Sequence, residues 1–240
     1  HAFMDEGFVT FFTVVATEDY FGRYNNVYNF KKWYHKILCF QNTDERNQIQ
    51  LNSLYLPKTG LEEPIATHSY RFKEQGLSGT SIYSKTAAVL FMLQYVLGDD
   101  VFEAAMREYY ERWKFKHPYP EDFYNVMEEV SGKRNLRWFF DQWFHKALMC
   151  DYGIKKMTYD KINRDENTIY RTTICIKRHK PAIMPVDVKI TMENGDSKVV
   201  WFPIELWSNA ETENDTTIEL PSKPVKAELN PDGRILDVNR

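Results

Sequence analysis

The sequence has few cysteines, and no two of them are close enough to share a metal ion. Cys39, Cys150 and Cys175 lie far apart, and none belongs to a CxxC motif. This spacing argues against a structural zinc site built from thiolates and against a framework of disulfides. Because the count is odd, at least one thiol is expected to be free or to pair outside the chain.

A strong charge of either sign is also missing. The formal net charge is −3, so the composition gives no reason to expect a nucleic-acid partner. A hydrophobic fraction of 43% and a charged fraction of 27% are typical of a soluble globular chain. These fractions argue against a disordered chain, and no membrane-spanning segment is expected.

Several common catalytic motifs do not occur. The sequence contains no glycine-rich phosphate loop, no G-x-S-x-G and no Cys/His dyad. The six histidines are scattered, and HExxH, which places two zinc-binding histidines on one face of a helix, is absent. His68 could approach a cleft, although a solvated surface histidine is the simpler interpretation.

The start of the chain shows neither an initiating Met nor the charged and then apolar pattern of an export signal. The first residues, from His1 onward, have the character of the middle of a structural element. We therefore expect the chain to be a piece of a longer protein.

Residues 1–150 show the apolar spacing of helices. Helices are predicted at residues 8–16, 24–40, 81–97, 102–113, 121–131 and 136–144. The stretch 81–97 is apolar nearly all round, which predicts a buried helix ended by Gly98, and Asp99 or Asp100 can cap the helix that follows. Residues 41–76 are polar, contain Pro57 and Pro64 and show no clear period, so they are predicted to form a covering loop.

From residue 151 onward the apolar period changes from that of helices to that of strands. Strands are predicted at residues 168–176, 186–192, 198–206, 216–220, 225–229 and 235–238, and Asn194-Gly195 predicts a type I′ hairpin turn. The expected fold class is α+β and multidomain. A helical domain at residues 1–150 would be followed by a small β-sandwich at residues 151–240.

The segment Phe3-Met4-Asp5-Glu6-Gly7-Phe8 resembles the W-L-x-E-G-F segment of the aminopeptidase N family of zinc peptidases, the gluzincins. Other segments resemble the family in the same order along the chain. Tyr83-Ser84-Lys85-Thr86-Ala87 is similar to its Y-x-K-G-A stretch, residues 97–102 to L-G-x-x-x-F, and residues 228–233 to the L-D-P of its small β-domain. The resemblance covers essentially the whole chain. It implies the helical half of a thermolysin-like catalytic domain followed by that β-domain.

This resemblance implies one zinc ligand and one catalytic group. Glu6 stands where the family has its third zinc ligand, and Tyr83 stands where it has a tyrosine that donates a hydrogen bond to the oxyanion of the tetrahedral intermediate. A phenol suits that role because it can stabilise charge that develops only in the transition state. From the residues alone, Asp5-Glu6 could instead be a solvated acidic pair at a helix start, and Tyr83 one more aromatic on a buried helix.

The sequence also departs from the family pattern. Phe3 replaces the usual Trp, Thr86 the usual Gly and Asn230 the usual Asp. None of these changes removes a chemical group that the mechanism needs, but they leave room for a relative that kept the fold and lost activity.

The resemblance predicts that the parent protein is a zinc-dependent aminopeptidase that removes residues from the amino termini of peptides. Its two histidine ligands and its general-base glutamate would belong to an upstream segment. The chain alone is therefore expected to be inactive and to hold no tightly bound zinc. The alternative is a non-catalytic relative in which the peptidase fold is a scaffold for protein–protein association.

Overall fold

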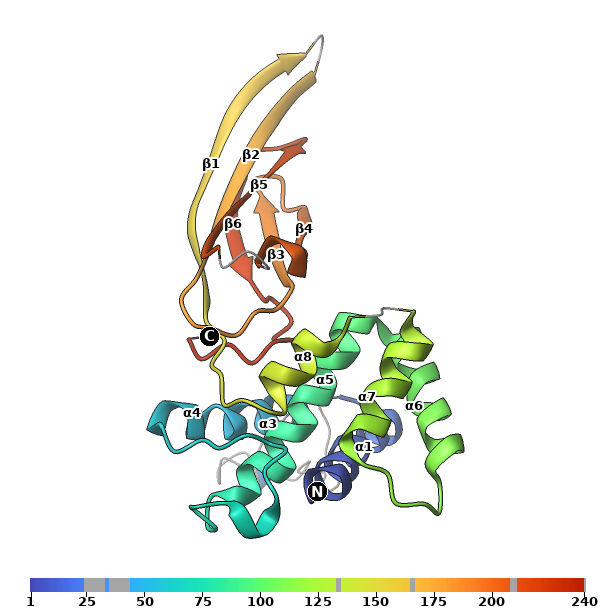
Figure 1. Cartoon of the computed structure of the whole chain (residues 1–240). Coiled ribbons are helices and arrows are strands. Elements are labelled where there is room, and N and C mark those ends of the chain that lie inside the picture. The colour runs from blue at the N-terminus through green and yellow to red at the C-terminus, as the bar shows by residue number, and fades with distance from the viewer. Residues whose placement is uncertain (24–32, 35–43, 133–134, 165–166, 208–210, 240) are drawn as a thin grey trace. The chain divides into compact units, whose positions relative to one another are not determined.

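The computed structural model describes residues 1–23, 33–34, 44–132, 135–164, 167–207 and 211–239. The chain divides into two compact units, His1–Ala147 and Leu148–Arg240. The first unit is helical and the second is built of antiparallel strands (Figure 1). The predicted fold class, helices followed by a small two-sheet β-domain, is confirmed. The helix predicted at residues 24–40 falls almost entirely outside the described residues.

Helix α1 (Phe3–Phe21) carries the acidic pair Asp5 and Glu6 in its first turn, where carboxylates interact favourably with the helix dipole. The helix ends at Gly22, whose φ of 85° lies in the region that favours glycine. Its buried face includes Phe11, whose ring centroid lies 4.5 Å from that of Phe91. The apolar run in the sequence therefore lies within a longer helix than the one predicted.

The predicted covering loop at residues 41–76 is partly helical, so that prediction was wrong in part. Helix α3 (Glu45–Ser53) begins at Asp44, whose side chain accepts hydrogen bonds from the backbone N–H groups of Arg46 and Asn47. It is followed by α4 (Tyr55–Thr59). Helix α3 buries mainly Ile49 and two small or polar side chains, which is too little apolar surface to produce a visible period.

The predicted buried helix contains an unexpected irregularity. After the short 3₁₀ helix η1 (Ser69–Arg71), the chain forms a π-helical turn, η2 (Thr80–Lys85), which runs directly into α5 (Thr86–Leu97). Helix α5 is buried along nearly its whole length, as predicted, and ends at Gly98 with φ 84°. A π turn adds a residue to one turn of a helix, and such turns are rare and often lie at functional sites.

Three further helices complete the first unit: α6 (Asp99–Trp113), α7 (Pro120–Ser131) and α8 (Arg137–Trp143). Gly98 is the N-cap residue of α6, and Asp99 and Asp100 lie in its first turn, so neither aspartate is the predicted cap. Helix α7 begins at Pro120, and the N–H of Tyr119 donates to the carboxylate of Asp122 at 2.8 Å. Helices α6 and α7 pack side by side (Figure 1).

The second unit contains, in its described residues, two three-stranded antiparallel sheets. One has the order β1-β2-β5, formed by β1 (Tyr152–Arg164), β2 (Asn167–Arg178) and β5 (Glu213–Leu220). The other has the order β4-β3-β6, formed by β4 (Ser197–Phe202), β3 (Val186–Met192) and β6 (Pro224–Leu229). Figure 1 shows β1 and β2 as a long curved hairpin. The core is formed by alternate side chains such as Val186, Val188 and Ile190, all fully buried.

Several details of the β prediction were wrong, and strand β1 was not predicted. In the β3–β4 hairpin the N–H of Gly195 donates to the carbonyl of Met192, and of the described residues of this loop only Gly195 has a positive φ, 89°. This is a three-residue loop with a left-handed glycine, and a type I′ turn would need a positive φ at Asn194 as well. The predicted strand at 198–206 ends at Phe202, before the 3₁₀ helix η3 (Ile204–Trp207). The predicted strand at 235–238 is reduced to one bridge, between Cys150 and Asp237.

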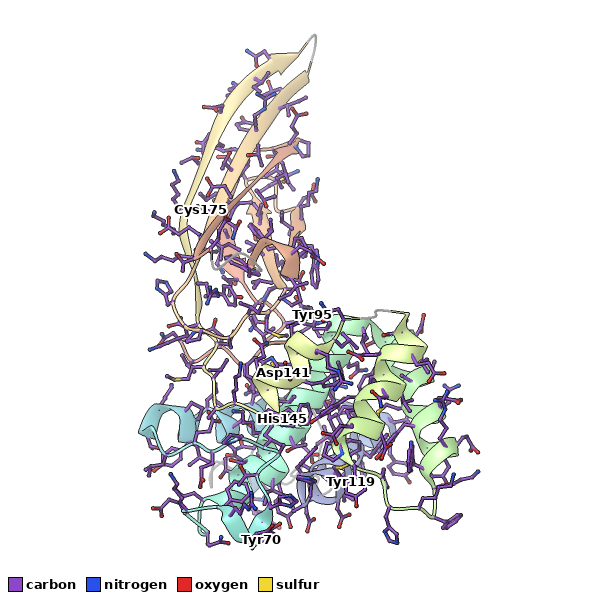
Figure 2. The ribbon with its side chains drawn as sticks, in the orientation of Figure 1. Tyr70, Tyr95, Tyr119, Asp141, His145 and Cys175 are labelled. Atoms are coloured by element: carbon purple, nitrogen blue, oxygen red, sulfur yellow. The ribbon has the colours of Figure 1, made fainter. Side chains whose placement is uncertain are left out.

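The described residues contain no helix that is both long and apolar enough to cross a membrane. Of the three cysteines, Cys150 and Cys175 are free, buried thiols, and Cys175 lies on β2 (Figure 2). Cys39 lies outside the described residues.

Candidate functional site

The first turn of α1 packs against the π turn η2, and this contact brings together the two residues that the sequence singled out. Glu6 lies on α1 and Tyr83 lies on η2. The pKa of Tyr83 is raised, and the largest cause is hydrogen bonding of its hydroxyl to the Glu6 carboxylate. Desolvation and the negative charges of Glu6 and Asp5 raise this pKa further. A negative carboxylate favours the neutral phenol, so the hydroxyl keeps its proton and remains a donor.

Tyr83 is accessible, in contrast to the rest of its turn. Its side chain is 42% exposed, whereas Ser81, Ile82 and Lys85 are buried. The alternative interpretation of Tyr83, a buried aromatic on a buried helix, is therefore wrong. A phenol that is held by a carboxylate and still open to solvent can also meet a substrate atom.

Gly7 explains how α1 and η2 come so close. A Cβ atom at this position would lie 2.2 Å from the Cγ2 atom of Thr86 and 2.8 Å from the backbone oxygen of Ile82. Real Cβ contacts are never this short, so only glycine fits here without a shift of one of the two elements. Gly7 thus sets the distance between the helix that carries Glu6 and the turn that carries Tyr83.

A hollow of about 570 Å³ opens beside Tyr83. One wall comes from α3 and α4, through Leu51, Asn52 and Tyr55, and the other from η2 and the residue before it. The wall formed by α3 and α4 was not predicted, because its residues lie in the stretch predicted as a loop. An open hollow next to an accessible hydroxyl has room for part of an extended ligand.

Lys85, in the same π turn, forms a buried ion pair with Glu62. The Nζ atom of Lys85 is 2.5 Å from the Oε1 atom of Glu62, and the two side chains are 3% and 4% exposed. Burial lowers the pKa of Lys85, and the attraction of Glu62 opposes this effect. In the sequence, Lys85 is part of the stretch similar to Y-x-K-G-A. Its partner Glu62 was not predicted, because Glu62 lies in the stretch predicted as a loop.

Metal ligands are scarce in this part of the protein. The described residues contain no group of three or more His, Cys, Asp or Glu side chains that could hold a metal ion. His68 does not join Glu6 in such a group. Its ring stacks on His1 at 4.1 Å and on Tyr70 at 5.4 Å, and Figure 2 shows Tyr70 at the margin of the helical unit. Glu6 offers one carboxylate, so these residues alone do not form a zinc site, which needs three or four protein ligands.

Comparison with known sequences identifies relatives of the chain. Residues 1–143 match the Peptidase family M1 domain. The chain is 28% identical over 163 residues to Aminopeptidase M1-D of Oryza sativa subsp. japonica, an alignment that covers 67% of this chain and 16% of that protein. It is 29% identical over 65 residues to Aminopeptidase N of Lactococcus lactis subsp. lactis, covering 27% of this chain and 8% of that protein. The chain thus spans a small part of the length of these relatives.

A solved structure has a similar fold. The crystal structure of Legionella pneumophila aminopeptidase A in complex with aspartic acid aligns with 98% of this chain and 23% of its own, with a TM-score of 0.60 and 16% identity. At this identity the likeness concerns the fold alone. The match covers both the helical and the β unit.

Proposed function

The chain belongs to peptidase family M1, and from this premise we propose that it is part of a zinc-dependent aminopeptidase, to which it contributes Glu6 as a zinc ligand and Tyr83 as the oxyanion donor. The observation that carries the proposal is the packing of α1 on the π turn, which brings Glu6 and Tyr83, two residues far apart in the sequence, so close that the Glu6 carboxylate raises the pKa of Tyr83. A solvated acidic pair and an unrelated tyrosine would have no reason to meet. A zinc ligand and an oxyanion donor must lie near each other, because the metal held by the one polarises the carbonyl group whose oxygen accepts a hydrogen bond from the other.

Each of the two residues has a separate task. Glu6 offers a carboxylate oxygen to the metal, at a helix start where its charge is favourable. Zinc, when bound in such an enzyme, acidifies a water molecule and polarises the carbonyl group of the substrate. Tyr83 donates its hydroxyl proton in a hydrogen bond to the carbonyl oxygen as that oxygen gains negative charge. The bond is strongest in the transition state, so it lowers the barrier rather than tightening substrate binding.

The remaining parts of the catalytic machinery must come from elsewhere in the parent protein. Two histidine ligands and a general base are required, and the described residues do not form a complete metal site. The substrate is proposed to be a peptide with a free amino terminus.

The direct test uses the full-length parent protein, purified with zinc. We expect it to release the first residue from a peptide with a free amino terminus and not from the same peptide acetylated at that terminus. Removal of zinc with a chelator should abolish release, and added zinc should restore it. A zinc-loaded protein that releases no residue from a panel of free-amino peptides would contradict the proposal and favour the scaffold function.

A further inference from the structure

We propose that the buried ion pair between Lys85 and Glu62 positions Tyr83 against Glu6, so that Lys85 and Glu62 are positioning residues for the reaction. This inference rests on the proposed role of Tyr83 and adds to it a cause for the position of the hydroxyl.

Stability alone does not explain the ion pair. Both side chains are almost completely removed from water. Burial of two charges costs so much desolvation energy that the mutual attraction roughly balances it, and well-packed apolar side chains in the same place are often equally stable or more so. Buried ion pairs are better attested as devices that select one arrangement of the chain over others.

Lys85 and Tyr83 share one turn of the chain. Both lie in the six-residue π helix η2, where Lys85 is buried and Tyr83 is accessible. The turn is also tied to itself, because the hydroxyl of Thr86 donates to the carbonyl of Ser81 at 2.9 Å. If this turn relaxed to a regular α-helix, the loss of its extra residue would rotate the side chains on one side of it by about 100° relative to the other side. Either Tyr83 would leave Glu6 or Lys85 would leave Glu62.

The backbone next to Glu62 is held firmly in place. Glu62 follows α4 and directly precedes a well-anchored segment, in which Ile65 is 1% exposed and the N–H of Ala66 donates to the carbonyl of Phe144 at 2.8 Å. The Nζ atom of Lys85 also lies 6.0 Å from the ring centroid of Trp143, at the end of α8. The ion pair therefore fastens the π turn to the α8 region.

The Glu62 carboxylate depends on Lys85 for its charge balance. The Oε2 atom of Glu62 is buried and has no hydrogen-bond partner among the described protein atoms. Lys85 is thus the partner that neutralises Glu62, and loss of the ammonium group would leave a buried charge. Such a charge is costly. Any rearrangement of the π turn that moves Lys85 away from Glu62 is disfavoured for the same reason.

The test therefore removes both charges together. The double variant Lys85→Met/Glu62→Leu replaces the pair by apolar side chains of similar size, which can keep the fold. In the 240-residue chain we expect a cooperative melt close to that of the unchanged chain. We also expect loss of the nuclear Overhauser effect between the Tyr83 ring protons and the Glu6 side chain. In the full-length enzyme, kcat should fall at least ~10-fold, while KM and zinc content stay unchanged, as expected for an oxyanion donor moved out of place.

The matched control is the exposed pair Glu103 and Arg107 on α6, whose side chains are 59% and 80% exposed. The variant Arg107→Met/Glu103→Leu introduces the same two apolar residues at an exposed Arg–Glu pair and should leave both the Tyr83–Glu6 contact and kcat as they are. Persistence of the contact and of full kcat in Lys85→Met/Glu62→Leu would overturn the proposal.

A second variant serves if the first one does not fold. Glu62→Asp keeps both charges but draws the carboxylate back by one methylene group, so it should weaken the Tyr83–Glu6 contact and lower kcat several-fold; an unchanged contact and kcat would overturn the inference. The contact is measured on the 240-residue chain and does not depend on catalysis. If Tyr83→Phe in the parent had full activity, the proposed function of Tyr83 would fail, whereas the positioning by the ion pair would still be decided by the contact.

Discussion

Gly7 lies so close to Thr86 that a Cβ atom on Gly7 would be 2.2 Å from the Thr86 methyl carbon. This contact sits one residue after Glu6 and joins α1 to the start of α5, next to the turn that carries Tyr83. Thr86 is also a position where the sequence departs from the family pattern. A residue larger than glycine fits at position 86 because position 7 has no side chain.

The substitution Gly7→Ala should force the two elements apart. Overpacking of a well-packed contact costs typically ~1–3 kcal/mol, so the free energy of unfolding of the helical unit should fall by about that amount. The double variant Gly7→Ala/Thr86→Gly should recover part of the loss, because it removes the two Thr86 atoms that clash. Urea denaturation of the single and double variants measures this coupling.

Gly79→Ala is the control for this prediction. A Cβ atom on Gly79 would meet nothing within 4 Å, and the backbone there is helical, with φ −54°. The change should be neutral or stabilise by up to ~1 kcal/mol. Equal destabilisation by Gly7→Ala and Gly79→Ala would show that the contact with Thr86 is not what requires glycine.

The hydrogen bond to Glu6 should be visible in the titration of Tyr83 in the metal-free 240-residue chain. The pKa of Tyr83 is raised, first by this bond, so Glu6→Gln should lower it toward the ordinary tyrosine value of about 10. In the unchanged chain, the raised pKa means that stability is fully present below pH ~10 and is lost as the pH rises through the folded-state pKa. Asp5→Asn should have a smaller effect, since its charge contributes least.

The measurement is a pH titration by NMR of tyrosine labelled at the ring Cζ carbon. Tyr83→Phe identifies the signal. A titration midpoint that Glu6→Gln does not move, or that Asp5→Asn moves more, would contradict the geometry.

Elements with strong local signals could be predicted from the sequence. Helix α7 begins at Pro120 and is followed by Gly132 in a left-handed conformation, as its sequence indicates. Strand β3 alternates fully between buried and half-buried residues. Strand β1 was missed because most of its side chains are exposed or half-buried, so they produce no apolar alternation. Its position depends on pairing with β2, the next strand along the chain.

The candidate site was only partly predictable. Glu6 and Tyr83 were found through motifs, and the structure brings them together. The π turn was not predicted, since one extra residue in a helix that is apolar all round leaves the hydrophobic pattern unchanged. Glu62 was missed for a similar reason: nothing in a polar stretch indicates which carboxylate becomes buried against a lysine.

The β unit should fold alone, and residues 148–152 should contribute to its stability. The structure assigns Leu148–Arg240 to this unit. The backbones of Cys150 and Asp237 form a β-bridge, and the carboxylate of Asp237 accepts a hydrogen bond from the N–H of Tyr152. The Tyr152 ring is buried. A chain of residues 148–240 should therefore show a cooperative melt. A chain of residues 153–240 should be about 3 kcal/mol less stable, the usual loss for a buried aromatic side chain. Circular dichroism during urea denaturation compares them, and equal stability would show that residues 148–152 are not part of the unit.

The 240-residue chain by itself should bind no stoichiometric zinc. Glu6 offers one ligand, whereas a stable site needs at least three. Elemental analysis after dialysis should therefore find far less than one zinc per chain. One tightly held zinc ion per chain would mean that other residues of this chain complete a site.

The central claim is that Glu6 holds the metal while Tyr83 serves the chemistry, and the most direct measurement compares Tyr83→Phe with Glu6→Ala in the full-length enzyme. Tyr83→Phe removes only a hydroxyl group, so kcat should fall at least ~100-fold while KM and zinc content stay near normal. Glu6→Ala should lose the zinc, because two histidines leave the metal with too few ligands. Full activity in Tyr83→Phe together with retained zinc in Glu6→Ala would contradict both assignments.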